Sequence, residues 1–277
     1  MTEKQASPVL LLDIGNTRTK WAFIDPEKEL STIDESNSGA IAHTEISDTS
    51  KNTALAQSVF GNHGITQQIV CVSVAGSQIT EQWQSICKAL WPNSKWHPFK
   101  STKDACGVSN NYTAPNSLGA DRWAAIIGAK TTNPNKEILI VNAGTATTID
   151  RVDAQGNFMG GWIIPGLSMM LASLASGTAD LPNLSPNASA SNQIGFGQST
   201  RECITQGCIQ SQIGAIVRAA ELLPPSSKII LSGGNSDYLH SQLADTLKNK
   251  YELILDKHVV LRGLQTWVNQ TSHEKNI

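Results

Sequence analysis

The stretch VLLLDIGNTRTKWAFID, from Val9 to Asp25, is the segment around which the rest of the chain is organised. Two short apolar runs flank a polar turn, and bounded apolar runs of this length are typical of strands. Gly15 and Asn16 favour a tight turn between them. Such a turn can approach a phosphate closely, because glycine lacks a Cβ atom and the Lys20 ammonium supplies positive charge. A plain hairpin without a ligand is the other interpretation of this stretch alone.

A second stretch repeats this pattern about half the chain further on. LLLDIGNTRT, which begins at Leu10, aligns with LIVNAGTATT, which begins at Leu139. Asp13 then matches Asn142, and Gly15 matches Gly144. Self-similarity at a fixed offset indicates duplicated architecture, so we expect two related halves that each open with a strand-turn-strand hairpin and face each other across a cleft. A chance similarity between two hairpin turns is the alternative.

Composition and charge exclude several classes of protein. The 277 residues, 40% hydrophobic and 16% charged, are typical of a soluble globular protein of one large domain or two ordinary ones. The net charge of -2 and the lack of any dense Lys/Arg run argue against a nucleic-acid partner. The five cysteines form no CxxC pair, and the N-terminal apolar run is too short for a signal peptide. We therefore expect a cytoplasmic protein with reduced thiols, no membrane-spanning segment and no nucleic-acid partner.

Strands alternate with helices along the chain, which predicts an α/β protein. Residues 27–50 are polar and indicate loops with a third weak strand. Residues 101–115 and 179–191 are further expected loops. Further strands are expected at 67–74, 96–99, 137–152, 158–164, 228–231 and 253–255, and helices at 77–91, 116–130, 167–176, 200–223, 237–248 and 259–268.

Common catalytic signatures are absent from the sequence. It contains no GxxxxGK[ST], no GxGxxG that opens a helix, and neither HExxH nor GxSxG. Polar turns rich in glycine and threonine and the GADR segment that opens a helix at Gly119 therefore remain as candidate sites.

Six segments in this order resemble the motifs of the type III pantothenate kinases, and the resemblance covers nearly the whole chain. They are LDIGNTRTK (12–20), NYTAPNSLGADR (111–122), NAGTATT (142–148), GGWIIPG (160–166), GQSTRECITQG (197–207) and LSGG (231–234). The family belongs to the acetate and sugar kinase, Hsp70 and actin superfamily. The resemblance thus implies an actin-like ATPase fold with two ribonuclease H-like halves around a nucleotide cleft, which we expect at residues 1–115 and 116–277.

The resemblance also implies roles for individual residues. Asp121 would be the general base that accepts the proton of the pantothenate hydroxyl, and Arg122 would bind the pantothenate carboxylate. Tyr112, Gly119, Ala120 and Thr200 would complete the substrate pocket. The structural alternatives are a helix-opening acid for Asp121, a surface salt bridge for Arg122, a loop residue for Tyr112 and a helix N-cap for Thr200.

The phosphate motifs imply an ATP site. Gly15, Asn16, Thr17 and Lys20 would contact the phosphates from one side, and Gly144 and Thr145 from the other. Asp13 would orient Mg²⁺ through water, since this ion usually keeps several water ligands. Asn142 departs from the family pattern, which often has an aspartate associated with K⁺ or NH₄⁺. A neutral amide would hold such an ion less strongly, so the need for a monovalent cation is left open.

The sequence thus predicts ATP-dependent phosphorylation of pantothenate to 4'-phosphopantothenate, the first step of coenzyme A biosynthesis, by an enzyme that is a homodimer like its family members. Two alternatives are a kinase of the same fold for another small alcohol and a non-catalytic accessory factor for transcription. The combination of Asp121, Lys20 and Arg122 favours catalysis.

Overall fold

The chain divides into two compact units. The computed structural model describes residues 7–28, 32–46, 49–177 and 195–274. One unit ends at Pro134 and resumes at His258, and the other covers Asn135–Lys257. This division differs from the boundary expected between residues 115 and 116, because helix α3 (Ala120–Thr132) packs on the C-terminal helix α7 (Val259–Glu274) and on strand β4 (Gln68–Ser73) of the first unit.

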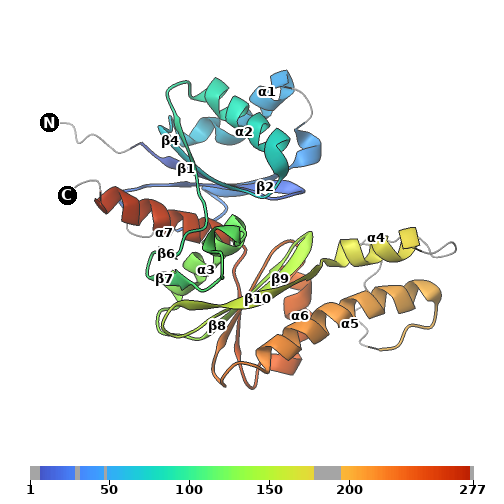
Figure 1. Ribbon diagram of the computed structural model, residues 1–277. Coiled ribbons are helices and arrows are strands. Elements are labelled where there is room, and N and C mark those ends of the chain that lie inside the picture. Colours follow the sequence, from blue (N-terminus) through green and yellow to red (C-terminus); the bar gives the residue numbers. More distant parts are fainter. Residues whose placement is uncertain (1–6, 29–31, 47–48, 178–194, 275–277) are drawn as a thin grey trace. The chain divides into compact units, whose positions relative to one another are not determined.

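The first unit is built on a five-stranded sheet in the order β3-β2-β1-β4-β5 (Figure 1). β1 (Val9–Ile14) and β2 (Arg18–Ile24) form the hairpin predicted from the sequence, and β3 (Ser38–Ala42) is the expected weak third strand. β4 pairs in parallel with β1, and β5 (Lys95–Pro98) pairs in parallel with β4. The end of β1, where Asp13 lies, is therefore next to a parallel strand of the sheet.

Helices cover both faces of this sheet. α1 (Thr49–Phe60) and α2 (Gly76–Leu90) pack on the face that carries Leu10, Leu12 and Ile14 of β1. The period of Ile79, Trp83, Ile86 and Leu90 predicted α2. α1 was not predicted, because its sequence has only weak amphipathic character. The one-turn helices His43–Glu45 and Gly61–His63 also belong to this unit.

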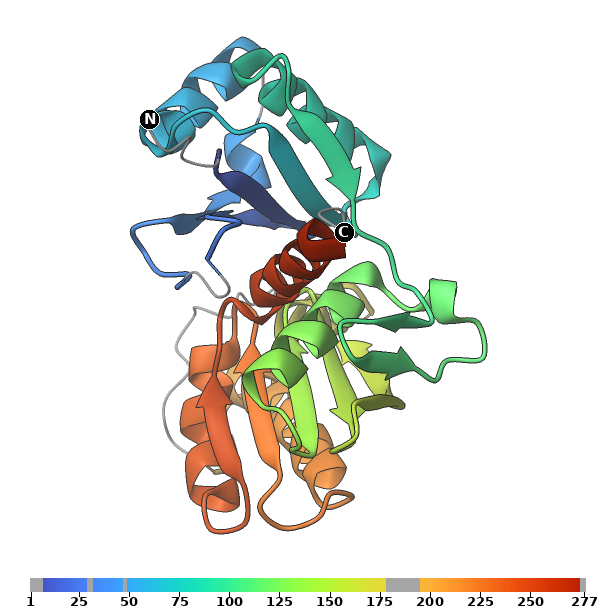
Figure 2. The ribbon, with the colours of Figure 1, turned by 90° about the vertical axis from the view of Figure 1, so that its left-hand side faces the viewer.

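On the other face, α3 and α7 lie side by side (Figure 2). Gly128 of α3 and Gly263 of α7 allow this close approach. A Cβ atom at Gly128 would collide with the backbone of Val259, and one at Gly263 would collide with the backbone of Ala124. The two helix backbones are thus in direct contact, which fixes α3 on the unit that carries β1.

The second unit repeats the pairing pattern of the first. Its strands follow the order β12-β11-β8-β9-β10, with antiparallel pairs from β8 to β10 and parallel pairs from β8 to β12. The predicted internal duplication is therefore confirmed at the level of strand pairing. The strands are β8 (Ile138–Ala143), β9 (Ala146–Val152), β10 (Asn157–Pro165), β11 (Lys228–Ser232) and β12 (Glu252–Leu255).

Three helices accompany this second sheet. α5 (Thr200–Ala220) and α6 (Ser236–Leu247) enclose an apolar core with β8 and β11. α4 (Leu167–Gly177) packs on α5 through Leu171 and Ile209. The loop predicted at 179–191 lies outside the described residues.

The segment predicted as an irregular loop at 101–115 contains regular structure. β6 (Asp104–Ala105) and β7 (Val108–Asn110) form a small hairpin, and Pro115–Ser117 form a helical turn. Cys106 and Gly107 adopt positive φ angles of 51° and 73° at its tip. Strands this short cannot be predicted from hydrophobic periodicity, because two or three residues are too few to show an alternating pattern.

Candidate functional site

The turn between β1 and β2 is held by backbone hydrogen bonds, one within the turn and one from the segment after β3. The Gly15 N–H donates to the Arg18 carbonyl at 3.1 Å, and the His43 N–H donates to the Thr17 carbonyl at 2.9 Å. Asn16 and Thr17 remain exposed. An ordered turn with exposed polar residues is the arrangement expected of a phosphate-binding loop.

Three charged groups lie near one another at the start of this turn. Asp13 pairs with Lys20 across the hairpin. Burial raises the pKa of the Asp13 carboxyl to about 6, while Lys20 lowers this pKa and the Asp121 charge raises it further. The first unit thus brings together the predicted metal-orienting carboxylate, phosphate-binding lysine and general base.

Asp121 stands in the first turn of α3, where the helix dipole favours a negative charge. Its Oδ1 accepts a hydrogen bond from the Arg122 N–H at 2.8 Å. Burial nevertheless raises the pKa of its carboxyl, and a raised pKa makes a carboxylate a stronger base. A Cβ atom at Gly119 would lie 2.8 Å from the Asp121 carboxylate, so a glycine here leaves room for that side chain.

Arg122 is buried, with 6% of its surface exposed, which contradicts the alternative of a surface salt bridge. Its Nη1 donates to the Tyr112 hydroxyl at 3.0 Å, and its guanidinium carbon lies 5.6 Å from the centre of the Tyr112 ring. The aromatic ring therefore fixes the guanidinium group, as required for recognition of a carboxylate.

Asn110 shapes the loop before this pair, although the sequence did not single it out. Its buried side chain donates to the carbonyls of Thr102 and Pro115 and accepts from the Tyr112 N–H. These bonds fix the backbone of Tyr112. A turn-forming asparagine beside the motif was the available signal.

In the second unit, the turn between β8 and β9 presents Gly144 and Thr145. The Gly144 N–H donates to the Ala146 carbonyl at 3.0 Å, and the Gly166 N–H donates to the Thr145 carbonyl at 3.0 Å. Thr145 is exposed. Asn142 occupies the penultimate position of β8, as Asp13 does in β1.

Thr200 begins α5 and is exposed, but it does not cap the helix. Ser199 is the N-cap, and its hydroxyl accepts from the Glu202 N–H at 3.3 Å. The Glu202 carboxylate in turn accepts from the Gln198 N–H at 2.8 Å. The capping alternative for Thr200 is therefore wrong, and its substrate-binding role stays a prediction.

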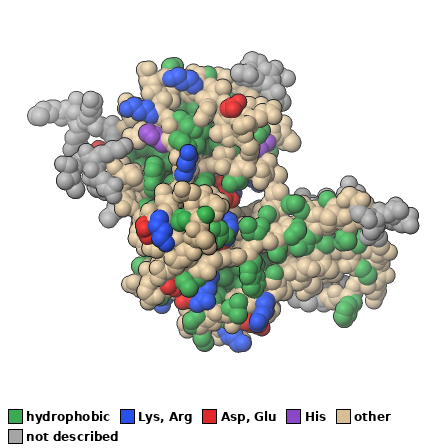
Figure 3. Space-filling model, in the orientation of Figure 1, with side chains coloured by type: hydrophobic (Ala, Val, Ile, Leu, Met, Phe, Trp, Pro, Cys, Tyr) green, Lys and Arg blue, Asp and Glu red, His purple; other side chains and the backbone are tan. Residues whose placement is uncertain are grey.

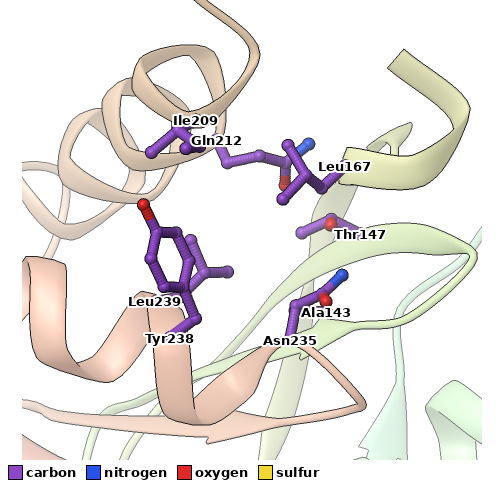
Figure 4. A pocket seen from close by; sticks show the side chains of 8 residues that line it. All are labelled: Ala143, Thr147, Leu167, Ile209, Gln212, Asn235, Tyr238 and Leu239. Carbon is purple, nitrogen blue, oxygen red and sulfur yellow. The ribbon is translucent and has the colours of Figure 1, made fainter. Parts of the chain in front are cut away.

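A small cavity of about 10 Å³ lies beside the second turn (Figure 4). Its volume matches about one water molecule. Its lining combines apolar side chains with the polar side chains of Thr147, Gln212, Asn235 and Tyr238. The cavity was not predicted, because no sequence pattern identifies a space among five separate elements.

Within the described parts of the chain, no cluster of three or more His, Cys, Asp or Glu residues could hold a metal ion. None of the described helices has the length and apolar character needed to cross a membrane.

Comparisons with known proteins identify the family and the fold. Residues 9–221 match the model of the family "Type III pantothenate kinase". The chain is 35% identical over 253 residues to a type III pantothenate kinase of Herminiimonas arsenicoxydans, covering 89% of this chain and 94% of the relative.

Solved structures that resemble this one include a putative transcriptional activator and a dehydratase activator. One is a putative Baf family transcriptional activator from Campylobacter jejuni, with a TM-score of 0.58, 19% identity and coverage of 95% of this chain and 99% of that one. The other is the activator of a Clostridium difficile 2-hydroxyisocaproyl-CoA dehydratase with bound ADPNP, with a TM-score of 0.53, 11% identity and 97% coverage of both chains. The fold is that of the actin-like ATPases.

Proposed function

The chain belongs to the type III pantothenate kinase family, and we propose that it phosphorylates pantothenate to 4'-phosphopantothenate with ATP, the first step of coenzyme A biosynthesis. The observation that carries this proposal is the proximity of Asp13, Lys20 and Asp121 in one unit, beside the Arg122 and Tyr112 pair. A base, a cation for phosphate and a carboxylate-binding group are the three functions that this reaction requires.

Asp121 acts as the general base. Its carboxylate takes the proton of the primary hydroxyl of pantothenate as the hydroxyl oxygen attacks the γ-phosphorus and the bond to ADP breaks. Arg122 binds the pantothenate carboxylate, with Tyr112 fixing the orientation of the guanidinium group. Gly119 and Ala120 place this pair at the start of α3, and Thr200 completes the substrate pocket.

The two turns bind the ATP phosphates. The exposed Asn16 and Thr17 and the ammonium of Lys20 serve the first turn, and Gly144 and Thr145 serve the second. Asp13 would hold Mg²⁺ through water, and the half-buried carboxylate beside Lys20 suits that role. The ion neutralises charge on the phosphates when bound.

Asn142 argues for a weak requirement for a monovalent cation. It stands opposite Thr148 in β9 and Ser232 in β11, so neither strand neighbour adds a negative charge. Without a carboxylate, the attraction for K⁺ or NH₄⁺ is reduced. Omission of both K⁺ and NH₄⁺ should therefore change the rate less than about twofold, since the neutral Asn142 amide binds such an ion only weakly.

An exposed apolar surface supports a homodimer. Met159 and Ile163 of β10 and Met169 of α4 are 52%, 61% and 47% exposed. Figure 3 shows hydrophobic side chains gathered on this part of the second unit. Surfaces of this kind commonly mark protein interfaces. Ile163→Glu should convert a dimer to a monomer in size-exclusion chromatography, and Leu222→Glu at another exposed apolar position should leave the dimer unchanged.

The proposal is tested by detecting ADP release with pantothenate and ATP in the presence of Mg²⁺, with and without K⁺ and NH₄⁺. Asp121→Asn should lower kcat by about 100-fold or more, the loss typical of a missing general base. Asp245→Asn, at an exposed carboxylate paired with Lys248, is the matched control and should leave kcat unchanged. An unaltered rate in Asp121→Asn would contradict the mechanism.

Two other functions are separated by the same measurements. A kinase for another small alcohol would release ADP with that alcohol and not with pantothenate. A regulator without turnover would release no ADP with any alcohol; the Campylobacter jejuni protein is named as a putative transcriptional activator. None of the five cysteines, all of which lie in the described part of the chain, forms a disulfide, and three of them are buried, which suits a cytoplasmic location.

A further inference from the structure

Gln212 is a buried polar residue on α5 that none of the family motifs includes. Its side chain is 1% exposed. The Nε2 group donates to the Pro165 carbonyl at 2.7 Å and lies 3.4 Å from the Met170 sulfur. The Oε1 atom has no hydrogen-bond partner among the described residues. A half-satisfied buried amide is unfavourable for stability, so its presence calls for a functional explanation.

The carbonyl that accepts the hydrogen bond from Gln212 belongs to Pro165. Pro165 and Gly166 form the corner between β10 and α4. The next residue, Gly166, donates its N–H to the Thr145 carbonyl at 3.0 Å. A Cβ atom at Gly166 would collide with the carbonyl oxygens of both Gly144 and Thr145. The Pro165–Gly166 corner thus packs directly against the Gly144–Thr145 turn, and the Gln212 side chain holds this corner through its hydrogen bond to Pro165.

The other end of the Gln212 amide borders the small cavity. Figure 4 shows the Gln212 and Asn235 amides directed toward Thr147, which lies between them. The Asn235 N–H donates to the Ala143 carbonyl at 3.1 Å, immediately before Gly144. The cavity of about 10 Å³ matches one water molecule, which would satisfy Gln212 Oε1 and link it to Asn235.

We propose that Gln212 is a positioning residue for ATP, which holds the Gly144–Thr145 turn through the Pro165–Gly166 corner on one side and a buried water beside Asn235 on the other. This inference rests on the proposed function, because it takes that turn as a phosphate-binding loop. Gln212 itself touches no substrate. Its loss should loosen the turn, so it should weaken binding of the nucleotide and leave binding of pantothenate unchanged.

The test compares Gln212→Met with Gln210→Met by calorimetric titration of Mg²⁺-ADP and, separately, of pantothenate. Methionine keeps the length of the side chain and removes both hydrogen-bonding groups. Gln210 lies on the same helix and is exposed, so its variant controls for the substitution itself. We expect Gln212→Met to weaken ADP binding about fivefold to tenfold, a loss of the size of one buried hydrogen bond, and Gln210→Met to leave it unchanged.

A second variant tests the corner independently. Gly166→Ala should weaken ADP binding in the same direction, whereas Gly214→Ala, at a helical glycine with nothing within 4 Å of an added Cβ, should not. If Gln212→Met fails to fold, as judged by circular dichroism, Gln212→Asn takes its place under the same criteria. The inference is wrong if ADP affinity is unchanged in Gln212→Met, falls equally in Gln210→Met, or falls together with pantothenate affinity.

The outcome also separates this inference from the proposed function. If the wild-type protein binds ADP but forms no ADP from ATP and pantothenate, the proposed function is wrong. The ADP titration still tests the role of Gln212 in that case. A wild-type protein that phosphorylates pantothenate, combined with normal ADP binding in Gln212→Met, would refute only the role of Gln212.

Discussion

Asp13 should destabilise the folded protein at neutral pH, because its ionised carboxylate is held away from water and, to a smaller extent, because it lies near the Asp121 charge. Its pKa is raised from 3.8 to about 6. Each tenfold change in an ionisation constant is worth about 1.4 kcal/mol, which gives about 3 kcal/mol in total. Solvent screening of this half-buried group reduces the figure to about 2 kcal/mol. Asp13→Asn removes the charge and should therefore raise the free energy of unfolding at pH 8 by about 2 kcal/mol.

The sign of the pH dependence follows from the same pKa. The folded carboxyl binds its proton more tightly than the unfolded one, so the free energy of unfolding of the wild type decreases as pH rises from about 4 to about 6. Below this range both forms are protonated and the advantage of Asp13→Asn disappears. Activity should fall by about 100-fold in the same variant, because the carboxylate that orients Mg²⁺ is missing.

Urea unfolding followed by circular dichroism at pH 4 and pH 8, without Mg²⁺ or nucleotide, measures this difference. Asp34→Asn is a control of opposite sign, because hydrogen bonds from Ser36 lower the pKa of Asp34. That variant should lose stability at pH 8. The reasoning is refuted if Asp13→Asn is no more stable than the wild type at pH 8, or if its advantage is equally large at pH 4.

Three further outcomes are expected. Gly263→Ala should lower the free energy of unfolding by about 2 to 3 kcal/mol through collision with α3, whereas Gly214→Ala should raise it by up to about 1 kcal/mol, both measured by urea unfolding. Arg122→Lys should raise the KM for pantothenate by about 10- to 100-fold and Tyr112→Phe by about fivefold, with the KM for ATP unchanged as the check on specificity. Asn142→Asp should introduce activation and thermal stabilisation by K⁺ relative to Na⁺, and equal melting temperatures in the two salts would contradict this.

The sequence predicted most elements of both units, because their strands are short apolar runs and their hairpins carry glycine turns. The duplication was visible because each hairpin has a glycine two residues after the matching Asp13 or Asn142. α1 was missed because its apolar residues are few and weakly periodic. The boundary between the units could not be predicted from residue types, since it depends on α3 packing against α7 through Gly128 and Gly263.

The motif resemblance selected the residues of the candidate site, whose roles stay predictions, but it could not predict their electrostatics. Motif resemblance selected Asp13 and Asp121, but their interaction is a property of the folded first unit. A surface salt bridge was the structural alternative for Arg122, because arginine is rarely buried without a partner. Its partner Tyr112 lies in a loop whose path depends on the buried Asn110. Long-range partners of this kind leave no local pattern.

The two hairpins share a backbone pattern, but they differ in charge, and the difference follows from the neighbours of each. In the first unit, the Asp13 carboxylate is tolerated because Lys20 lies opposite it in the next strand, although Asp121 adds repulsion. In the second unit, the matching position faces Thr148 and Ser232, which supply no positive charge. A carboxylate there would need a bound cation to offset its desolvation, whereas the Asn142 amide needs none. Asparagine in place of aspartate at position 142 therefore avoids an unpaired charge in the second unit. It also removes the electrostatic attraction for a monovalent cation.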